Sequence, residues 1–461
     1  MRTFIVLGGL AALISILAVA RGSRSTLWWG LPAILLLTPT YIHHAINGHV
    51  GGQAMLLVGI LIGGSIGPLT RLRWTWTDTL VMLIWIAQLA SDGTNNKITT
   101  VPLVLMLFYT LIPYFLGRVF LRSWEDVGSA LRPLMICVGL LAASVTIEAL
   151  TGFSVFRALF SKNSVSVMRA GFHRAMGTHT HPIIQGLTLL LAWPWTLEAA
   201  RRARAGLGPK WWRALPWLVV IAIFGTVSRG PMAAAIIACG VYLFFSRPSW
   251  RMPLATMGVA MAIMFFVGFD QIRNAMLVMS GESEAIEAEG VHYKVINGEE
   301  YAYNGTDHRW LLFKAYAIPL SNAGLLGFGY GEAEGSQEVL AMNASFWSID
   351  NTQIVWILTY GYLGLALFYA FALVVMVGLT RVGLDRANPF STLASGMAAA
   401  LVAFHVALLS VALIREYHPD WMFFMGAAVT VVQLARQMPT ARPPRNVQPL
   451  SPNPWPQTFG R

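Results

Sequence analysis

Residues 352–378 read TQIVWILTYGYLGLALFYAFALVVMVG, a run in which no side chain carries a charge. A helix of this length exceeds the roughly 20 residues that are needed to cross the hydrocarbon part of a bilayer. The stretch therefore predicts a membrane-spanning helix rather than the core helix of a water-soluble domain. Similar apolar runs recur along the whole chain.

The composition agrees with a membrane protein. Of the 461 residues, 56% are hydrophobic and 11% are charged, whereas an ordinary soluble domain contains about 25% charged residues. This deficit excludes a soluble enzyme, a disordered chain and a collagen-like chain. Cys137 and Cys239 both lie in apolar runs and do not form a disulfide framework. The predicted fold is an all-α, polytopic transmembrane helical bundle.

Hydropathy divides the chain into about 12–14 spans, with about 13 as the best count. The pair on either side of Ser228-Arg229-Gly230-Pro231 is predicted to form a tight helical hairpin with Arg229 at its tip. The spans lie at roughly 3–20, 26–42, 51–70, 77–91, 100–118, 131–151, 183–200, 214–228, 231–246, 252–269, 352–378, 390–413 and 421–435.

The basic residues orient these spans. Short loops that face the cytoplasm are enriched in Lys and Arg, and 20 of the 32 such residues fall on one set of alternating loops and the C-terminal tail. This pattern explains the net charge of +11 without nucleic acid, and it places the N-terminus outside and the C-terminus inside. The 20 residues are Arg21, Arg24, Arg71, Arg73, Arg118, Arg122, Arg132, Arg201, Arg202, Arg204, Lys210, Arg213, Arg247, Arg251, Arg381, Arg386, Arg436, Arg442, Arg445 and Arg461.

The predicted domain organisation is a transmembrane domain over residues 1–436 followed by a tail. The first span is expected to be retained rather than cleaved as a signal peptide, because it lacks a convincing small-residue cleavage site. The tail, 437–461, is rich in proline and is predicted to be disordered and cytoplasmic. Two long segments, about 152–182 and 270–351, are predicted to face the periplasm, and connections this long are usually functional.

The first periplasmic segment breaks the charge rule. It contains Arg157, Lys162, Arg169 and Arg174 and no acidic residue. One interpretation is a basic loop that rests on anionic lipid headgroups. The other is a binding site for an anion at the membrane surface, for which arginine is well suited because its planar fork donates two hydrogen bonds to a phosphate.

Three histidines, His173, His179 and His181, cluster beside Arg174. A His-x-His pair could bind a metal, but no cysteine or carboxylate lies nearby in the sequence to complete a coordination shell. The sequence therefore predicts neither a metal ion nor another cofactor.

The second periplasmic segment is acidic in its first half and then becomes helical in pattern. Residues 306–316 are predicted to form a helix at the membrane surface, apolar on one side and carrying Arg309 and Lys314. This segment makes the long periplasmic loop partly helical.

Two short motifs follow that helix. The stretch GFGYG at 327–331 follows no strand, which excludes a Rossmann or P-loop motif and leaves a flexible turn as one interpretation. Asp350 and Asn351 stand directly before the span at 352–378, and either residue is a candidate helix cap.

Four stretches, taken in their order and spacing, resemble the bacterial superfamily of O-antigen ligases and O-antigen and exopolysaccharide polymerases, which are integral-membrane glycosyltransferases. The likeness covers roughly residues 170–380, and the first 150 residues add only hydropathy. The stretches are Arg174 to Pro182, with Arg-x-x-Gly ending in His-Pro; Ser228-Arg229-Gly230; Arg309 to Gly329, with an Arg-Trp helix and a Gly-x-Gly turn; and Asp350-Asn351 followed by Gly361-Tyr362-Leu363-Gly364.

The resemblance implies a periplasmic cavity in which a glycan passes from a polyprenyl diphosphate, such as undecaprenyl diphosphate, to an acceptor hydroxyl without a metal. It implies that arginines hold the diphosphate, and this role falls on Arg174 and Arg309. Asp350 takes the place of the essential polar residue before the late span. These three residues are the expected catalytic set, and the further substrate contacts are Arg169, His181, Asn351 and Arg229.

The leading hypothesis is a periplasm-facing polymerase of cell-surface polysaccharide in the inner membrane, because the resembling ligases carry histidine where this chain has Asp350. Its expected partners are a polyprenyl-diphosphate-linked glycan donor, membrane lipid, and an acceptor that is either a lipid-linked repeat unit or lipid A core. A chain-length regulator protein is a further candidate partner. The nearest alternative is a ligase that moves the glycan to the lipid A core of lipopolysaccharide or to a protein. A transporter or flippase of lipid-linked sugar, with charges deep within its spans, and a non-catalytic scaffold are alternatives of other classes.

Overall fold

The computed structural model describes residues 23–41, 43–45, 50–62, 66–160, 168–169, 171–267, 293–296, 298–302, 308–330, 349–411 and 418–438. The described part is mostly helical. Its strands form three antiparallel two-stranded hairpins, which pair β1 (His43–Ala45) with β2 (Val50–Gly51), β3 (Met168–Arg169) with β4 (Phe172–His173), and β5 (Tyr293–Ile296) with β6 (Glu299–Ala302).

The helices follow the apolar runs of the sequence. They are α2 (Ser23–Leu37), α3 (Gly52–Ile60), α4 (Ile66–Thr70), α5 (Trp76–Thr94), α6 (Thr100–Met106), the π-helical η2 (Leu107–Leu111), α7 (Ile112–Phe120), α8 (Trp124–Thr151), α9 (Val155–Phe160), α10 (Pro182–Arg204), η3 (Lys210–Arg213), α11 (Leu215–Gly225), α12 (Arg229–Ser246), η4 (Pro248–Trp250), α13 (Arg251–Val267), α16 (His308–Ala315), α17 (Ala317–Asn322), α19 (Thr352–Leu384), α20 (Ser391–Ala407) and α21 (His418–Gln437).

Helices lie at the predicted spans that fall within the described residues. The predicted span 3–20 and the tail from residue 439 fall outside the described residues, and the span at 51–70 is divided between α3 and α4. In the described part, four helices are long and apolar enough to cross a membrane, namely Pro102–Phe120, α8, α12 and α19. The helical, membrane-type fold is confirmed, and the count of about 13 spans stays a prediction.

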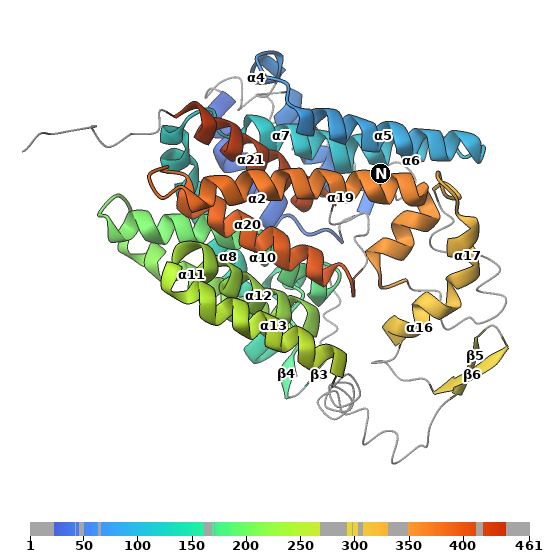
Figure 1. The fold of residues 1–461 in the computed structure, drawn as a ribbon. Coiled ribbons are helices and arrows are strands. Elements are labelled where there is room, and N and C mark those ends of the chain that lie inside the picture. The colour runs from blue at the N-terminus through green and yellow to red at the C-terminus, as the bar shows by residue number, and fades with distance from the viewer. Residues whose placement is uncertain are drawn as a thin grey trace, which may run out of the picture.

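The centre of the bundle is formed by α10, α20 and α21, most of whose residues are buried. α20 packs against α10, α12 and α19, while α21 packs against α7. Figure 1 shows α16, α17 and the β5–β6 hairpin gathered at one end of the bundle, beyond the end of α19. This end carries the segments that were predicted to face the periplasm.

The packing of α7 on α21 places the two backbones in direct contact. A Cβ atom added to Gly426 would lie 2.1 Å from the Tyr114 carbonyl oxygen. Beside this contact the Arg118 guanidinium is fully buried and binds both carboxylate oxygens of Asp78, at 2.8 and 3.1 Å. Arg118 was counted above among the cations of the cytoplasmic loops. The structure corrects this assignment, because a buried guanidinium with a carboxylate partner contributes no free charge to a loop.

The helix α19 is broken near its N-terminal end. Gly361 has φ 68° and ψ −173°, which no helical residue adopts. The Trp356 and Phe368 rings lie with their centroids 4.6 Å apart, although residues twelve apart in a straight helix are separated by about 18 Å. The first arm, 352–360, therefore folds back on the second, 362–384. The apolar run at 352–378 was predicted to form one span. In the structure it forms two helical arms that are separated by the break at Gly361.

The glycine-rich segment 324–329 holds this break in place. The amides of Phe328 and Gly329 donate to the last carbonyls of the first arm, Leu358 O at 2.7 Å and Thr359 O at 3.0 Å. The first amides of the second arm, at residues 362 and 363, donate to the carbonyls of residues 324 and 325. The segment therefore satisfies the orphan groups of both helix ends, and it is a docked element rather than a free turn.

We expect Gly361→Ala to destabilise the protein. The position combines a positive φ with a Cβ that would lie 2.2 Å from the Leu325 carbonyl oxygen, so the loss should exceed about 2 kcal/mol. Thermal unfolding in detergent measures it. Gly258→Ala in α13 is the control, because nothing lies within 4 Å of a Cβ there. Equal melting temperatures of the two variants would contradict the role of the break.

Candidate functional site

Three helices begin at one place in the described structure. α12 begins beside α10, where a Cβ on Gly186 would lie 2.5 Å from Pro231. The first arm of α19 is tied to the end of α20, because Thr352 Oγ1 donates to Val411 O at 2.6 Å. Val411 also lies beside Gly230 of α12. The N-termini of α10, α12 and α19 therefore converge, and helix N-termini attract anions through their free amides and the helix dipole.

The loop that enters α10 is anchored at several points. The Glu148 carboxylate of α8 accepts hydrogen bonds from the Met176 amide at 3.2 Å and the Gly177 amide at 3.0 Å. Gln185 Oε1 accepts from the Thr178 amide at 2.9 Å. Gly177 has φ 55°, and a Cβ there would collide with the Gln185 side chain. These contacts fix the backbone that carries Arg174 and His181.

The turn between α11 and α12 is strained. Val227 has φ 46°, a left-handed conformation that costs a β-branched residue about 1–2 kcal/mol. The next residue, Ser228, donates its hydroxyl to Thr226 O at 3.1 Å and accepts from Arg174 Nη2 at 3.4 Å. Arg229 begins α12, as the predicted hairpin required. The strained turn thus holds Ser228 and Arg229 against the loop of Arg174.

The arginines of this region act on one another. Burial, and the positive charges of Arg169 and Arg229, lower the pKa of Arg174 from its ordinary value. An arginine remains protonated even so, and Arg169 and Arg229 therefore each repel Arg174. The buried Nε of Arg174 has no hydrogen-bond partner among the described residues. The structure therefore brings together three of the predicted anion-binding arginines, and a bound anion would relieve their repulsion.

His181 is the N-cap of α10. It lies near enough to Arg174 and Asp350 for both charges to act on its ring. Loss of hydration and the charge of Arg174 lower its pKa, whereas Asp350 acts in the opposite direction. The ring is therefore neutral at pH 7. Its Nδ1 accepts the Ile183 amide at 3.2 Å, so Nε2 carries the proton. A neutral His181 is a hydrogen-bond donor in the site, and its acceptor nitrogen is already in use.

The two candidate caps of α19 have different roles. Asn351 is the N-cap, because its Oδ1 accepts the Ile354 amide at 3.0 Å, and its Nδ2 donates to Leu409 O at 2.8 Å. Both the oxygen and the nitrogen of its side-chain amide are therefore hydrogen-bonded within the protein, and Asn351 is 1% exposed. Asp350 precedes the cap, is only half-buried, and is close enough to His181 to influence its pKa.

Arg309 belongs to the expected catalytic set. It lies in the helix α16, which begins close to the predicted start, but its side chain falls outside the described part of the chain. The helix itself is fixed, because Leu311, Leu312 and Tyr316 are buried in a cluster with residues at the start of α19. Lys314 Nζ reaches the Tyr301 hydroxyl at 2.9 Å. The predicted role of Arg309 in the site stays a prediction.

Sequence reasoning missed the residues that position the site. Glu148 and Gln185 lie within predicted spans and belong to no motif that was recognised. A carboxylate inside an apolar run is itself a signal, because burying it requires partners. Among the described residues, no group of three His, Cys, Asp or Glu side chains could hold a metal ion, and the metal-free expectation stays a prediction.

Comparisons with known proteins agree with the motifs. The family model described as O-antigen ligase matches residues 214–369 and confirms the resemblance to the O-antigen ligase and polymerase superfamily. No curated protein matches the chain. A solved chain described under "Structural coordination of polymerization and crosslinking by a peptidoglycan synthase complex" is 16% identical with a TM-score of 0.41, over 80% of this chain and 100% of that chain. A likeness of this size carries no functional argument.

We expect Asn351→Ala and Asp350→Ala to differ in stability. Loss of the cap should cost about 0.5–2 kcal/mol, and the Leu409 carbonyl loses its partner as well. Asp350→Ala should cost less, because the cap remains. Thermal unfolding in detergent distinguishes the two variants. A larger loss for Asp350→Ala would show that the carboxylate, rather than Asn351, holds the start of α19.

Proposed function

We propose that the protein is a polymerase of a cell-surface polysaccharide. It transfers a glycan from a polyprenyl diphosphate carrier to a sugar hydroxyl of another lipid-linked repeat unit, on the periplasmic side of the inner membrane. The observation that carries the proposal is the meeting of three helix N-termini with Arg169, Arg174 and Arg229 beside the carboxylate of Asp350.

The cationic side of the site suits the donor. A diphosphate linked to both lipid and sugar is an anion, and its negative charge grows as the bond to the sugar breaks. Fixed guanidinium groups and helix N-termini stabilise that growing charge more than the charge of the ground state. Arg174 is half-buried and already donates to Ser228 before substrate binds, which reduces the reorganisation that the proposed reaction would need.

Asp350 suits the acceptor. In the proposed step the acceptor oxygen forms a bond to the anomeric carbon, the bond from that carbon to the diphosphate oxygen breaks, and the hydroxyl proton passes to the Asp350 carboxylate. His181 is a poor choice of base because its only lone pair accepts the Ile183 amide. It can instead donate from Nε2 to a phosphate or acceptor oxygen. Asp350 therefore serves as the base or as the orienting group for the hydroxyl.

A ligase is the second candidate, and the match of residues 214–369 to the O-antigen ligase model favours it. It would use the same donor and the same leaving group, with the lipid A core as acceptor. The polymerase is preferred because the ligases that this chain resembles have histidine at the position of Asp350. Transfer by the purified protein from a defined lipid-linked repeat, to either acceptor, decides between the two.

The orientation of the site can be tested by cysteine labelling. In a background with Cys137→Ala and Cys239→Ala, we expect Ser321→Cys in α17 to react with an impermeant maleimide from outside spheroplasts. Ser249→Cys in η4 should react only after permeabilisation. Both serines are exposed in the structure. The reverse pattern would place the site in the cytoplasm and contradict the proposed function.

We expect Arg174→Ala to slow transfer by roughly 10²–10³-fold, as the loss of one charge-stabilising donor does elsewhere. Arg174→Lys should recover only part of the rate, because an ammonium lacks the planar fork. Asp350→Asn should be nearly inactive although it keeps the shape of the side chain. The rate of polymer formation from purified protein measures all three.

Arg386→Ala is the matched control, because this arginine is exposed and donates to the Ser246 carbonyl at 3.1 Å, away from the proposed site. Its rate should equal that of the wild type. A normal rate for Arg174→Ala or Asp350→Asn would remove that residue from the mechanism. Loss of wild-type activity in EDTA, with recovery on addition of a divalent metal, would contradict the metal-free mechanism.

A further inference from the structure

Asp420, in the first turn of α21, is a buried carboxylate that the proposed reaction does not use. It is 7% exposed and lies within the helical bundle. Its Oδ2 accepts the Thr188 hydroxyl at 2.8 Å, and its Oδ1 accepts the Gln53 amide at 3.4 Å. A buried carboxylate is costly unless it is compensated by hydrogen bonds or by a cation.

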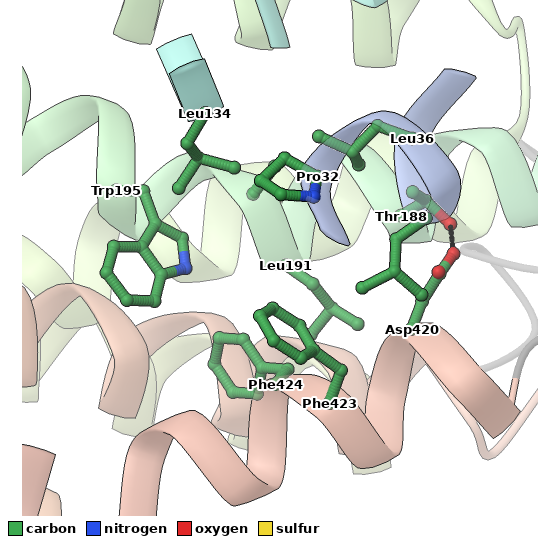
Figure 2. Close-up of a pocket in the computed structure, with 11 residues that line it drawn as sticks. Pro32, Leu36, Leu134, Thr188, Leu191, Trp195, Asp420, Phe423 and Phe424 are labelled. Carbon is green, nitrogen blue, oxygen red and sulfur yellow. Dashed lines mark hydrogen bonds between the residues drawn. The ribbon is translucent and has the colours of Figure 1, made fainter. Parts of the chain in front are cut away.

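The other side of Asp420 faces an apolar cavity. Its volume is about 40 Å³, and Thr188 and Asp420 are the polar residues at its edge. Figure 2 shows the Thr188–Asp420 hydrogen bond beside the apolar side chains of the wall, which include Leu36, Leu191, Trp195, Phe423 and Phe424. The aliphatic and phenyl side chains of this wall offer the carboxylate no hydrogen bond, and the hydrogen bonds of Asp420 come from Thr188 and Gln53.

From Thr188 a short relay leads to the loop of the site. Thr188 Oγ1 lies 3.0 Å from Nε2 of His179, and the same nitrogen lies 3.7 Å from Asp420 Oδ2. Because Thr188 donates its proton to the carboxylate, it accepts from His179, which must carry a proton on Nε2. His179 is completely buried. The relay therefore connects α21 through α10 to the loop between Arg174 and His181.

We propose that Asp420, acting through Thr188 and His179, is a positioning residue for this loop. The inference rests on the proposed function for its catalytic consequence, but the structural link does not depend on it. Glu148 and Gln185 hold residues 176–178. The relay holds the next residue, His179, which lies two positions before His181, the N-cap of α10. The Thr178 carbonyl also accepts the Thr40 amide at 2.8 Å, and the relay is the contact that ties His179 to α10 and α21.

The chain offers a matched pair of variants. Thr188→Val keeps the shape of the side chain and removes the hydroxyl of the relay. Thr188→Ser keeps the hydroxyl and removes only the methyl group. Thr196→Val is the control, because Thr196 is also buried in α10 but its hydroxyl donates within its own helix, to the Trp193 carbonyl at 2.7 Å. Asp420→Asn is a second variant, which keeps one acceptor oxygen and replaces the other with an amide nitrogen that cannot accept a hydrogen bond.

Two measurements on the full-length protein in detergent test the proposal. We expect hydrogen exchange of the amides of residues 176–179 to become about tenfold faster in Thr188→Val and in Asp420→Asn, as expected for one lost buried hydrogen bond. Exchange elsewhere should not change, and Thr188→Ser and Thr196→Val should behave as the wild type. In the transfer assay, the KM for the lipid diphosphate donor should rise in the same two variants.

The outcomes separate the inference from the proposed function. Unchanged exchange of the loop in Thr188→Val would overturn the positioning role, whatever the enzyme assay shows. Equal acceleration in the Thr196→Val control would also overturn it, because the effect would then be a general loosening of α10. Faster exchange in a protein that shows no transfer even as wild type would support the positioning role and overturn the proposed function.

Discussion

The hydrogen bonds that close the break at Gly361 determine where the proposed site lies. A helix that ends inside a membrane bundle leaves amides and carbonyls that no water can satisfy, and here the segment 324–329 satisfies both sides of the break. The first arm can therefore fold back along the second. Its nine residues span about 14 Å, so this fold brings Asp350 down to the end of α20, beside the loop of His181.

The site that results gathers positive charge before any substrate is bound. Helix N-termini and arginines are placed together at a cost, which is visible in the lowered pKa of Arg174. Glu148 lies close to the loop, but its carboxylate is engaged by the amides of residues 176 and 177. This arrangement favours an anion site over a basic loop that rests on lipid headgroups, since headgroup binding would not require Arg174 to be half-buried and held by Ser228.

The sequence predicted the positions of the described apolar helices and the turn at Arg229, because hydropathy and charge act locally along the chain. It could not predict the break in α19, since an apolar run has the same composition whether its helix is straight or folded back. It also could not choose between Asp350 and Asn351 as the cap, because both side chains can accept an amide proton. Arg118 was misplaced for a related reason. Its partner Asp78 is distant in sequence, and only the close contact of α7 with α21 shows that the charge is buried.

The residues that form the proposed site are spread beyond the segment that matches the O-antigen ligase model. That segment, 214–369, supplies Ser228, Arg229 and Asp350. Arg174 and His181 come before it, and their loop is held by Glu148 of α8 and Gln185 of α10. The relay from α21 reaches the same loop from the far end of the chain. The proposed chemistry therefore depends on helices outside this segment that position the loop of Arg174 relative to Asp350, and changes in those helices would be expected to alter the proposed reaction without changing the matched segment.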